Sequence, residues 1–213
     1  MKVCNLAMEE IKVGTGQLVL VGGRPAIGKT AFAISIVLEM AMKGYKTVFF
    51  SMEMSKEGWI ERASKRMHII PDDLPISNID IIDEAAISVD RIAELSTVEN
   101  RYDLIVVDYL QLIDRGDGSV VDVLNDLNAL SVKLRCPIMI LSQLNRSIDV
   151  RDDHKPMMDD LVLANINIDL FGQVFLLYRD YYYNRDADET KLIVIMKDKE
   201  VLLKWDYQSI SVV

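Results

Sequence analysis

Short, almost uninterrupted apolar runs recur along the whole chain, separated by polar turns or by longer mixed segments. Runs of this kind, rich in Val, Ile, Leu and Phe and without alternation, predict strands that are buried on both faces of a sheet. The predicted strands are residues 17–22, 47–52, 104–108, 137–142, 174–178, 192–196 and 201–205.

Helix-length segments lie between several of these runs, at residues 29–42, 55–67, 88–98 and 120–134. Since strand and helix alternate as far as residue 140, the pattern predicts a parallel sheet covered by helices on both sides. The last three strands follow one another closely, which favours antiparallel neighbours at one edge. We therefore expect a doubly wound α/β fold with a mainly parallel sheet, forming one domain over residues 1–213 in which 1–15 are an extension.

Two polar stretches, residues 145–160 and 183–190, predict loops. The first joins the fourth and fifth predicted strands and exceeds the usual length of about 2–6 residues, so we expect it to be functional or mobile. Three basic residues in it, among them Arg151 and Lys155, could follow a nucleic-acid backbone, but surrounding aspartates cancel their field. The tyrosines at 181–183 fit either stacking on a base or an edge or interface contact.

Composition narrows the class of protein. The 213 residues are 50% hydrophobic and 27% charged, which excludes a disordered chain. The formal net charge of -9 is opposite to that of a general nucleic-acid or anionic-membrane binder, so any nucleic acid must be held by a local patch. Cys4 and Cys136 indicate neither a disulfide framework nor a zinc ribbon. With no signal peptide or apolar span in the sequence, we expect a cytoplasmic protein without a membrane partner.

The strongest chemical signal is the segment GRPAIGKT, which follows the first predicted strand and precedes a predicted helix. It satisfies G-x-x-x-x-G-K-[ST], a pattern whose glycines let backbone N–H groups and a helix N-terminus surround a nucleotide phosphate. Lys29 would supply a positive charge, and the Thr30 hydroxyl a ligand for Mg²⁺. The predicted nucleotide-binding residues here are Gly23, Arg24, Pro25, Ala26, Ile27, Gly28, Lys29, Thr30 and Ala31.

Polar residues at the ends of other predicted strands complete this site. The third strand ends in Asp108, the expected carboxylate on the Mg²⁺ side. Tyr109 follows it, so the carboxylate that activates water must come from elsewhere. Glu53 follows the second strand, and because parallel strands share one carboxyl edge it is the predicted general base; otherwise it only caps the helix starting near Ser55. Gln143, after the fourth strand, can sense the terminal phosphate or orient water.

Several blocks of the sequence, in order, resemble the RecA-like ATPase domain of the DnaB-type replicative DNA helicases. The blocks are VGGRPAIGKTAFAI, FFSMEMS, LIVVDYLQLI, ILSQLNR, KPMMDDL and FLLYRDYYYN. This resemblance implies an ATPase that uses ATP and Mg²⁺, takes Glu53 as its catalytic glutamate and drives DNA unwinding in replication. It also implies that Arg179 stacks on the adenine and that Lys197 lies on a strand reaching a neighbouring subunit's nucleotide.

Other stretches depart from the family pattern. The first predicted strand begins at residue 17, whereas family members carry a helical N-terminal domain and a linker helix before it. The stretch between Glu53 and Asp108 is shorter than usual, and residues 162–167 replace a loop that touches DNA in the family. Lys199 stands in the place of an arginine finger and lacks the planar fork of arginine.

These observations lead to two main interpretations. The first is a Mg-ATP-dependent ATPase of the helicase type, which self-associates and holds single-stranded DNA. The second is a shortened paralogue that binds nucleotide, hydrolyses it slowly and docks onto a replication helicase; the acidic charge, the altered loop and Lys199 motivate it. A recombinase-like or clock-type ATPase acting on protein partners is a third possibility, which the blocks YLQL and SQLNR disfavour.

Overall fold

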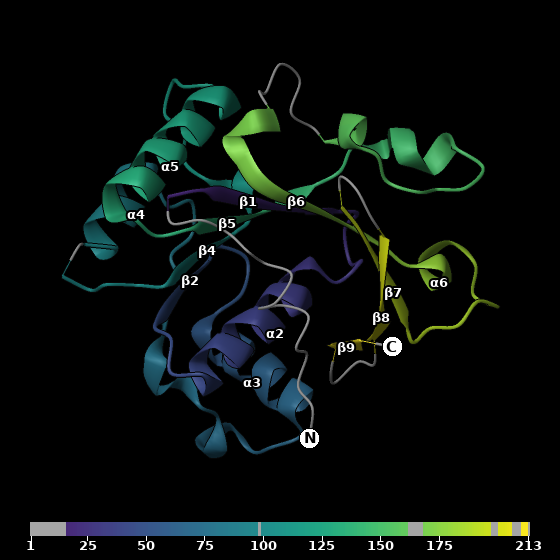
Figure 1. Cartoon of the computed structure of the whole chain (residues 1–213), viewed down its shortest axis with the longest axis horizontal. Helices are drawn as coiled ribbons and strands as arrows, with labels where there is room; N and C mark the ends of the chain where they lie inside the picture. The colour runs from purple at the N-terminus through teal and green to yellow at the C-terminus, as the bar shows by residue number, and fades with distance from the viewer. Residues whose placement is uncertain (1–15, 98, 162–167, 197–199, 206–209, 213) are drawn as a thin grey trace.

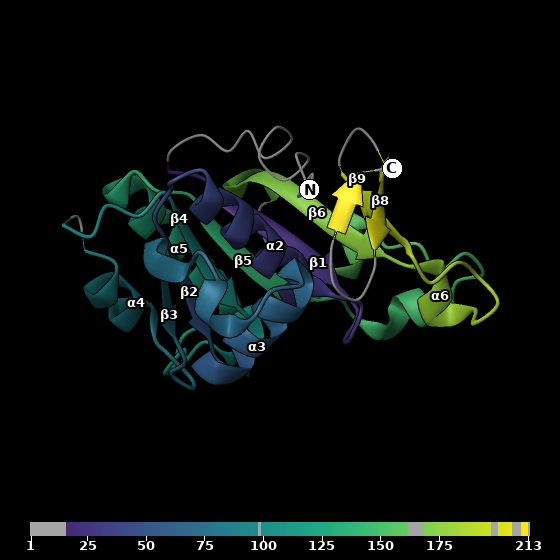
Figure 2. The same ribbon diagram turned by 90° about the horizontal axis from the view of Figure 1, so that it is seen from below.

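A central sheet carries helices on both of its faces (Figures 1 and 2). The computed structural model describes residues 16–97, 99–161, 168–196, 200–205 and 210–212. Within these residues the sheet has nine strands in the order β3-β2-β4-β5-β1-β6-β7-β8-β9. Their bounds are β1 (Leu18–Gly23), β2 (Thr47–Ser51), β3 (Ile79–Ile82), β4 (Leu104–Asp108), β5 (Ile138–Gln143), β6 (Phe171–Tyr178), β7 (Lys191–Ile195), β8 (Glu200–Trp205) and β9 (Ile210–Val212).

The sheet changes from parallel to antiparallel at β6. All neighbouring pairs from β3 to β6 are parallel, whereas β6–β7, β7–β8 and β8–β9 are antiparallel. This arrangement confirms the predicted doubly wound, mainly parallel sheet with an antiparallel C-terminal edge. β6 is the turning point, because it runs parallel to β1 and antiparallel to β7.

Two strands, β3 and β9, were absent from the prediction. In β3, the buried Ile79 and Ile81 alternate with the partly exposed Asp80 and Ile82. Alternation of this kind is typical of a strand that is covered less completely than a central one, so a search for continuous apolar runs overlooks it. β9 is short and lies at the opposite edge of the sheet.

The helices fall between the strands as predicted. They are α2 (Lys29–Met42), α3 (Lys56–Met67), α4 (Val89–Leu95) and α5 (Val120–Leu134), with a short α6 (Asp180–Tyr183) after β6. Serine hydroxyls accept first-turn amides at the start of α3, α4 and α5, namely Ser55, Ser88 and Ser119. None of the helices in the described part of the chain is long and apolar enough to cross a membrane.

The central strands are buried on both faces because helices cover each side. In β1, Val19 and Val21 join the core beneath α2 and α3, while Leu18 and Leu20 join the core beneath α4 and α5. In Figure 1, α2 and α3 lie below the sheet and α5 lies above it. This double burial explains why the strands read as continuous apolar runs.

The parallel strands end together at one edge of the sheet. Gly23 at the end of β1 pairs with Gln143 of β5, and Ser51 of β2 pairs with Asp108 of β4. The loops that leave these positions therefore lie side by side.

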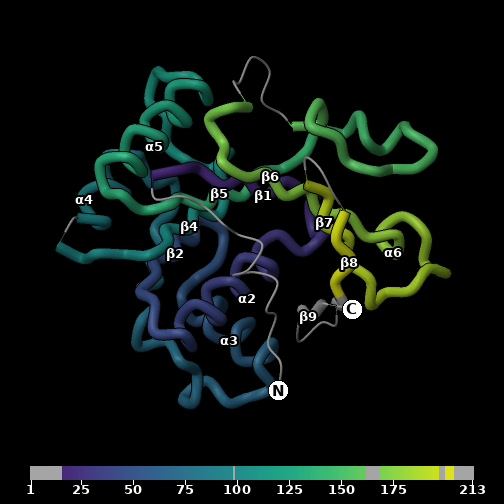
Figure 3. Tube along the Cα trace, viewed as in Figure 1, coloured from purple at the N-terminus to yellow at the C-terminus, as the bar shows by residue number. Residues whose placement is uncertain are grey.

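The predicted loop at residues 145–160, called the bracket below, follows β5. It contains two 3-10 turns, η4 (Arg146–Val150) and η5 (Met158–Asp160). Figure 3 shows it in green, extending from the sheet on the same side as α6. The Tyr178 hydroxyl, at the end of β6, donates to Oδ1 of Asp180 at 2.7 Å and lies 3.1 Å from the carbonyl oxygen of Asp153 in the bracket.

Candidate functional site

The glycine-rich loop, residues 23–30, connects β1 to α2. Gly28 precedes α2 as its N-cap and has a φ of 119°, a conformation that favours glycine. No side chain caps α2, and its first turn carries no acidic residue. The first amides of α2 are therefore left without a side-chain acceptor, and together with the helix dipole they favour an anion at this point.

Gly23 is a position at which only glycine fits without rearrangement. A Cβ atom there would lie 2.6 Å from Cγ2 of Ile27 and 3.3 Å from Cγ of Lys29. Ile27 is only 1% exposed, so it has little room to move away. The close approach lets the loop fold tightly over the end of β1.

Lys29 is buried at the start of α2, and its ammonium group is held by the loop itself. Nζ donates to the carbonyls of Gly23 at 3.0 Å and Arg24 at 3.2 Å. Burial lowers the pKa of Lys29 to about 8, and the charges of Asp108 and Glu53 only partly offset this effect. The amine is therefore a mostly protonated cation at pH 7, kept in a position where further negative charge would stabilise it.

Asp108 lies at the end of β4 and is 3% exposed. Burial raises its pKa to about 6; the hydrogen bond with the Thr30 side chain opposes this rise, and the charge of Glu53 adds to it. Four predicted residues, Lys29, Thr30, Glu53 and Asp108, thus come within electrostatic reach of one another, from three different strand ends.

The oxygen atoms of Thr30 and Asp108 suit a hard divalent cation such as Mg²⁺. In the described residues no three His, Cys, Asp or Glu side chains gather as a metal cage. An ion held at this point would take its remaining ligands from phosphate oxygens and water, which is the usual pattern for Mg²⁺ at a nucleotide.

Glu53 follows β2 and is exposed. The N-cap of α3 is Ser55, whose hydroxyl accepts the amide of Gly58 at 3.2 Å. Ser55 therefore caps α3, and the alternative explanation, that Glu53 only caps this helix, does not hold. The charge of Glu53 shifts the pKa values of both Asp108 and Lys29, so its carboxylate lies within electrostatic reach of both.

Gln143 lies at the end of β5, beside Gly23. Its backbone amide donates to Oε1 of Gln111 at 3.3 Å, and Nε2 of Gln111 donates to the Ser142 hydroxyl at 3.0 Å. Gln111 lies in the turn η3 (Leu110–Leu112), which follows β4. This side chain ties the ends of β4 and β5 together, a role that its place in the sequence does not signal.

The remaining predicted residues are placed differently. The Arg24 guanidinium turns towards Asp149 of the bracket, at 2.7 Å, rather than lying free over the loop. Arg179 is 7% exposed at the end of β6, and its Nη2 donates to the carbonyl of Glu189 at 2.7 Å. Lys197 and Lys199 lie outside the described residues.

Basic and aromatic side chains of the bracket and α6 make contacts within the chain. Arg151 pairs with Asp160 at 2.5 Å, and Lys155 pairs with Glu200 at 3.2 Å. The ring of Tyr183 stacks on His154, with centroids 4.2 Å apart. These residues are therefore engaged by other side chains of the same chain.

Comparison with known families decides what this fold and loop belong to. The family model of the DnaB-like helicase C-terminal domain matches residues 10–74 and 63–204. The chain belongs to this family. The resemblance inferred from the sequence blocks is thereby confirmed, and the two matched pieces meet within the stretch between Glu53 and Asp108.

Individual members of the DnaB-like helicase family agree with this assignment. Replicative DNA helicase DnaB of Geobacillus stearothermophilus is 34% identical over 216 residues, covering 86% of this chain and 47% of that protein. A solved ATPase domain superposes with a TM-score of 0.82 at 25% identity, over 94% of this chain and 86% of that one. A DnaB-like replicative helicase solved with its interactions with primase gives 0.83 at 25% identity, over 93% and 57%. The fold is thus RecA-like, and the chain spans about half the length of its DnaB relative.

Proposed function

We propose that the chain is a Mg-ATP-dependent ATPase that acts as the motor part of a replicative DNA helicase. The observation that carries the proposal is the convergence of Lys29, Thr30, Glu53 and Asp108 beside the uncapped N-terminus of α2. Membership of the DnaB-like helicase family supports it.

The described geometry suggests how the work is divided among these residues. The amides at the start of α2 and the Lys29 ammonium bind the β- and γ-phosphates of ATP, and Lys29 leaves the carbonyls of Gly23 and Arg24 to do so. Thr30 and Asp108 hold Mg²⁺, which when bound neutralises charge on the phosphate oxygens. Burial disfavours the charged forms of Lys29 and Asp108 in the free chain, and a bound phosphate and cation would stabilise these charges.

Glu53 is the general base in this proposal. Its exposed carboxylate can reach a water molecule in line with the γ-phosphate and accept a proton from it. Gln143 lies at the neighbouring strand end and orients that water or reports the loss of the phosphate. The side-chain contacts of Gln111 to the Gln143 amide and the Ser142 hydroxyl tie this strand end to the turn after β4.

Replacement of Lys29 by Ala tests the site. We expect Lys29→Ala to weaken MgATP binding about 10–100-fold, because it removes a charge-assisted contact to phosphate, and to abolish turnover. Binding is measured by titration with a fluorescent ATP analogue. Lys65→Ala, at an exposed lysine of α3 that pairs with the exposed Glu61, is the matched control. Equal affinity of Lys29→Ala and wild type would show that the loop is not the binding site.

A second function, docking of a nucleotide-binding chain onto a replication helicase, is favoured by the net charge of -9 and by the sequence at 162–167 and Lys199. The two functions differ in assembly and in their response to DNA. Native mass measurement with MgATP and single-stranded DNA separates them: a ring on DNA whose ATPase is stimulated supports the motor, and a monomer that binds only added helicase supports docking.

A further inference from the structure

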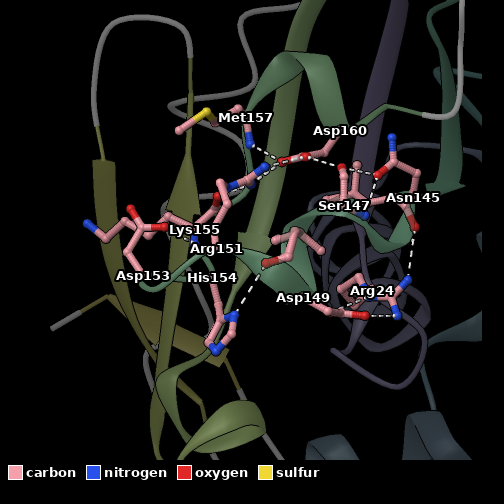
Figure 4. A network of polar contacts seen from close by, with 12 residues as sticks. Arg24, Asn145, Ser147, Asp149, Arg151, Asp153, His154, Lys155, Met157 and Asp160 are labelled. Carbon is pink, nitrogen blue, oxygen red and sulfur yellow. Dashed lines mark hydrogen bonds and ion pairs between the residues drawn. The ribbon is translucent and has the colours of Figure 1, made fainter.

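The bracket is held together by one buried carboxylate. Asp160 is 1% exposed, and its oxygens accept hydrogen bonds from both terminal nitrogens of Arg151, at 2.7 and 2.5 Å (Figure 4). The Met157 amide at 2.7 Å and the Ser147 hydroxyl at 2.9 Å donate to the same carboxylate. The Asn145 amide donates to the Asp160 carbonyl at 2.8 Å and closes the loop. The bracket is thus a cross-braced unit rather than an open loop.

Arg24 joins the glycine-rich loop to this unit. Its Nη2 and Nε donate to the two carboxylate oxygens of Asp149 at 2.7 and 3.2 Å, and its Nη1 donates to the carbonyl of Leu144 at 3.1 Å. A bidentate pair fixes orientation as well as distance. The Arg24 side chain is 12% exposed and the Asp149 side chain 37%, so the guanidinium is shielded from water and the carboxylate is open to it. All three acceptors belong to the bracket or to the residue directly before it.

Asp149 is itself supported from a second element. The Tyr183 hydroxyl of α6 donates to Oδ1 of Asp149 at 3.4 Å, and the Tyr183 ring stacks on His154 of the bracket. At the end of β6, the Tyr178 hydroxyl lies 3.1 Å from the Asp153 carbonyl of the bracket, but its shorter hydrogen bond, at 2.7 Å, goes to Oδ1 of Asp180. The carboxylate that receives Arg24 is therefore contacted from α6 as well as from the glycine-rich loop.

The same residue, Arg24, acts on Lys29 through its backbone. Lys29 Nζ rests on the carbonyls of Gly23 and Arg24, so the orientation of these peptides sets the position of the ammonium group. Pro25 follows, and its ring restricts the backbone on that side of Arg24. Contacts that hold the Arg24 side chain therefore also hold the first peptides of the glycine-rich loop, on which Lys29 rests.

We propose that Arg24 is a positioning residue, whose pairing with Asp149 anchors the glycine-rich loop to the bracket and so sets the affinity for the nucleotide. The inference rests on the proposed ATPase function, and it gives the bracket a role that the loop's own sequence motif does not include. Asp149 acts only through Arg24 and makes no contact with the phosphates.

A direct phosphate contact by Arg24 is the competing explanation, and it makes the opposite prediction for Asp149. If Arg24 reached the phosphates, removal of Asp149 would free the guanidinium and leave nucleotide affinity unchanged or higher. If Arg24 positions the loop, Asp149→Ala lowers the affinity as much as Arg24→Gln does, about tenfold, and the double variant is no weaker than either single one.

The experiment measures MgATP-analogue affinity and thermal unfolding of the full chain for Arg24→Gln, Asp149→Ala and the double variant. Asp149→Glu, which keeps the carboxylate, is expected to retain most of the affinity. Glu84→Ala, which removes one of two carboxylates beside Arg91 on the surface, is the matched control and should change nothing. Unchanged or tighter binding by Asp149→Ala overturns the proposal.

A second measurement needs no nucleotide. Amide hydrogen exchange of residues 26–30 is expected to be faster in Arg24→Gln and in Asp149→Ala than in wild type. In Glu84→Ala it should equal the wild-type rate. If wild type itself fails to bind MgATP, the proposed function falls, and this exchange pattern still decides the anchor. Unchanged exchange in both variants shows that the pair does not hold the loop. Should Asp149→Ala unfold, Asp149→Asn takes its place.

Discussion

Two aspartates are almost equally buried, Asp108 at 3% and Asp160 at 1% exposure, but their surroundings affect them in opposite ways. Burial raises the pKa of Asp108 to about 6, and the hydrogen bond with Thr30 does not compensate. Burial also acts to raise the pKa of Asp160, but hydrogen bonds, led by those from Arg151, outweigh it and hold the pKa below its usual value.

The difference separates a carboxylate whose charge is incompletely compensated from one that braces the chain. Buried charge is costly unless it is paired and hydrogen-bonded. Asp160 meets that requirement within the chain, so it can serve structure alone. Asp108 and Lys29 are also hydrogen-bonded, but their contacts do not offset burial, which raises the pKa of Asp108 to about 6 and lowers that of Lys29 to about 8. Two opposite, incompletely compensated charges beside the N-terminus of α2 are what a charged ligand would stabilise.

The largest expected effect concerns the stability that Asp160 gives to the bracket. Asp160→Asn leaves Arg151 without its anionic partner, and we expect it to lower the free energy of unfolding by about 3 kcal/mol. Urea unfolding followed by circular dichroism measures this. Asp159→Asn, at the exposed neighbouring position, should lie within about 0.5 kcal/mol of wild type. If the two variants were equally stable, the four contacts to Asp160 would contribute nothing to the fold.

The edge of the sheet that carries Asp108 could be predicted from the sequence, whereas the contacts of the bracket could not. The central strands could be predicted because double burial leaves continuous apolar runs, and Asp108, Glu53 and Gln143 could be placed at one edge because parallel strands end together. β3 was missed because its apolar residues alternate with others. In each case the prediction depended on a pattern within one element.

The bracket could not be predicted in this way. Asp149 lies 125 positions from Arg24, and nothing in the sequence around either residue announces the pair. Arg151 stands among aspartates, and only the folded chain selects Asp160 as its partner. Contacts of this kind depend on where two loops come together, which local periodicity does not encode. The predicted loop was correctly located, but its internal bracing had no local signal.

The second prediction concerns how nucleotide affinity changes with pH when Asp108 is protonated. Its carboxylate must be ionised to serve a cation, so protonation through a pKa of about 6 should weaken magnesium-dependent nucleotide binding about tenfold between pH 7 and pH 5. Titrations with the ATP analogue at fixed Mg²⁺ measure this slope. Asp108→Asn binds more weakly but should lose the carboxyl's share of the slope, which separates it from protonation of the nucleotide itself. An identical slope in both proteins would assign the pH dependence to the nucleotide.

The smallest expected effect is also the one that runs against intuition. Because the folded chain binds the Asp108 proton more tightly than the unfolded chain does, the ionised carboxylate costs stability at pH 7. This cost declines as the pH falls from about 6 towards the usual aspartate pKa of 3.8. Asp108→Asn keeps the shape and an acceptor for Thr30 but removes the charge, so we expect it to raise the free energy of unfolding by about 1 kcal/mol at pH 7.

The gain should disappear near pH 4, where wild-type Asp108 is protonated in the folded chain, so urea unfolding at both pH values checks the sign as well as the size. Asp160→Asn should destabilise at pH 7 under the same conditions. A loss of stability in Asp108→Asn as large as that in Asp160→Asn would show that both carboxylates brace the fold. A higher free energy of unfolding in Asp108→Asn alone would show that the ionised Asp108 destabilises the fold, which is expected of a residue retained for binding.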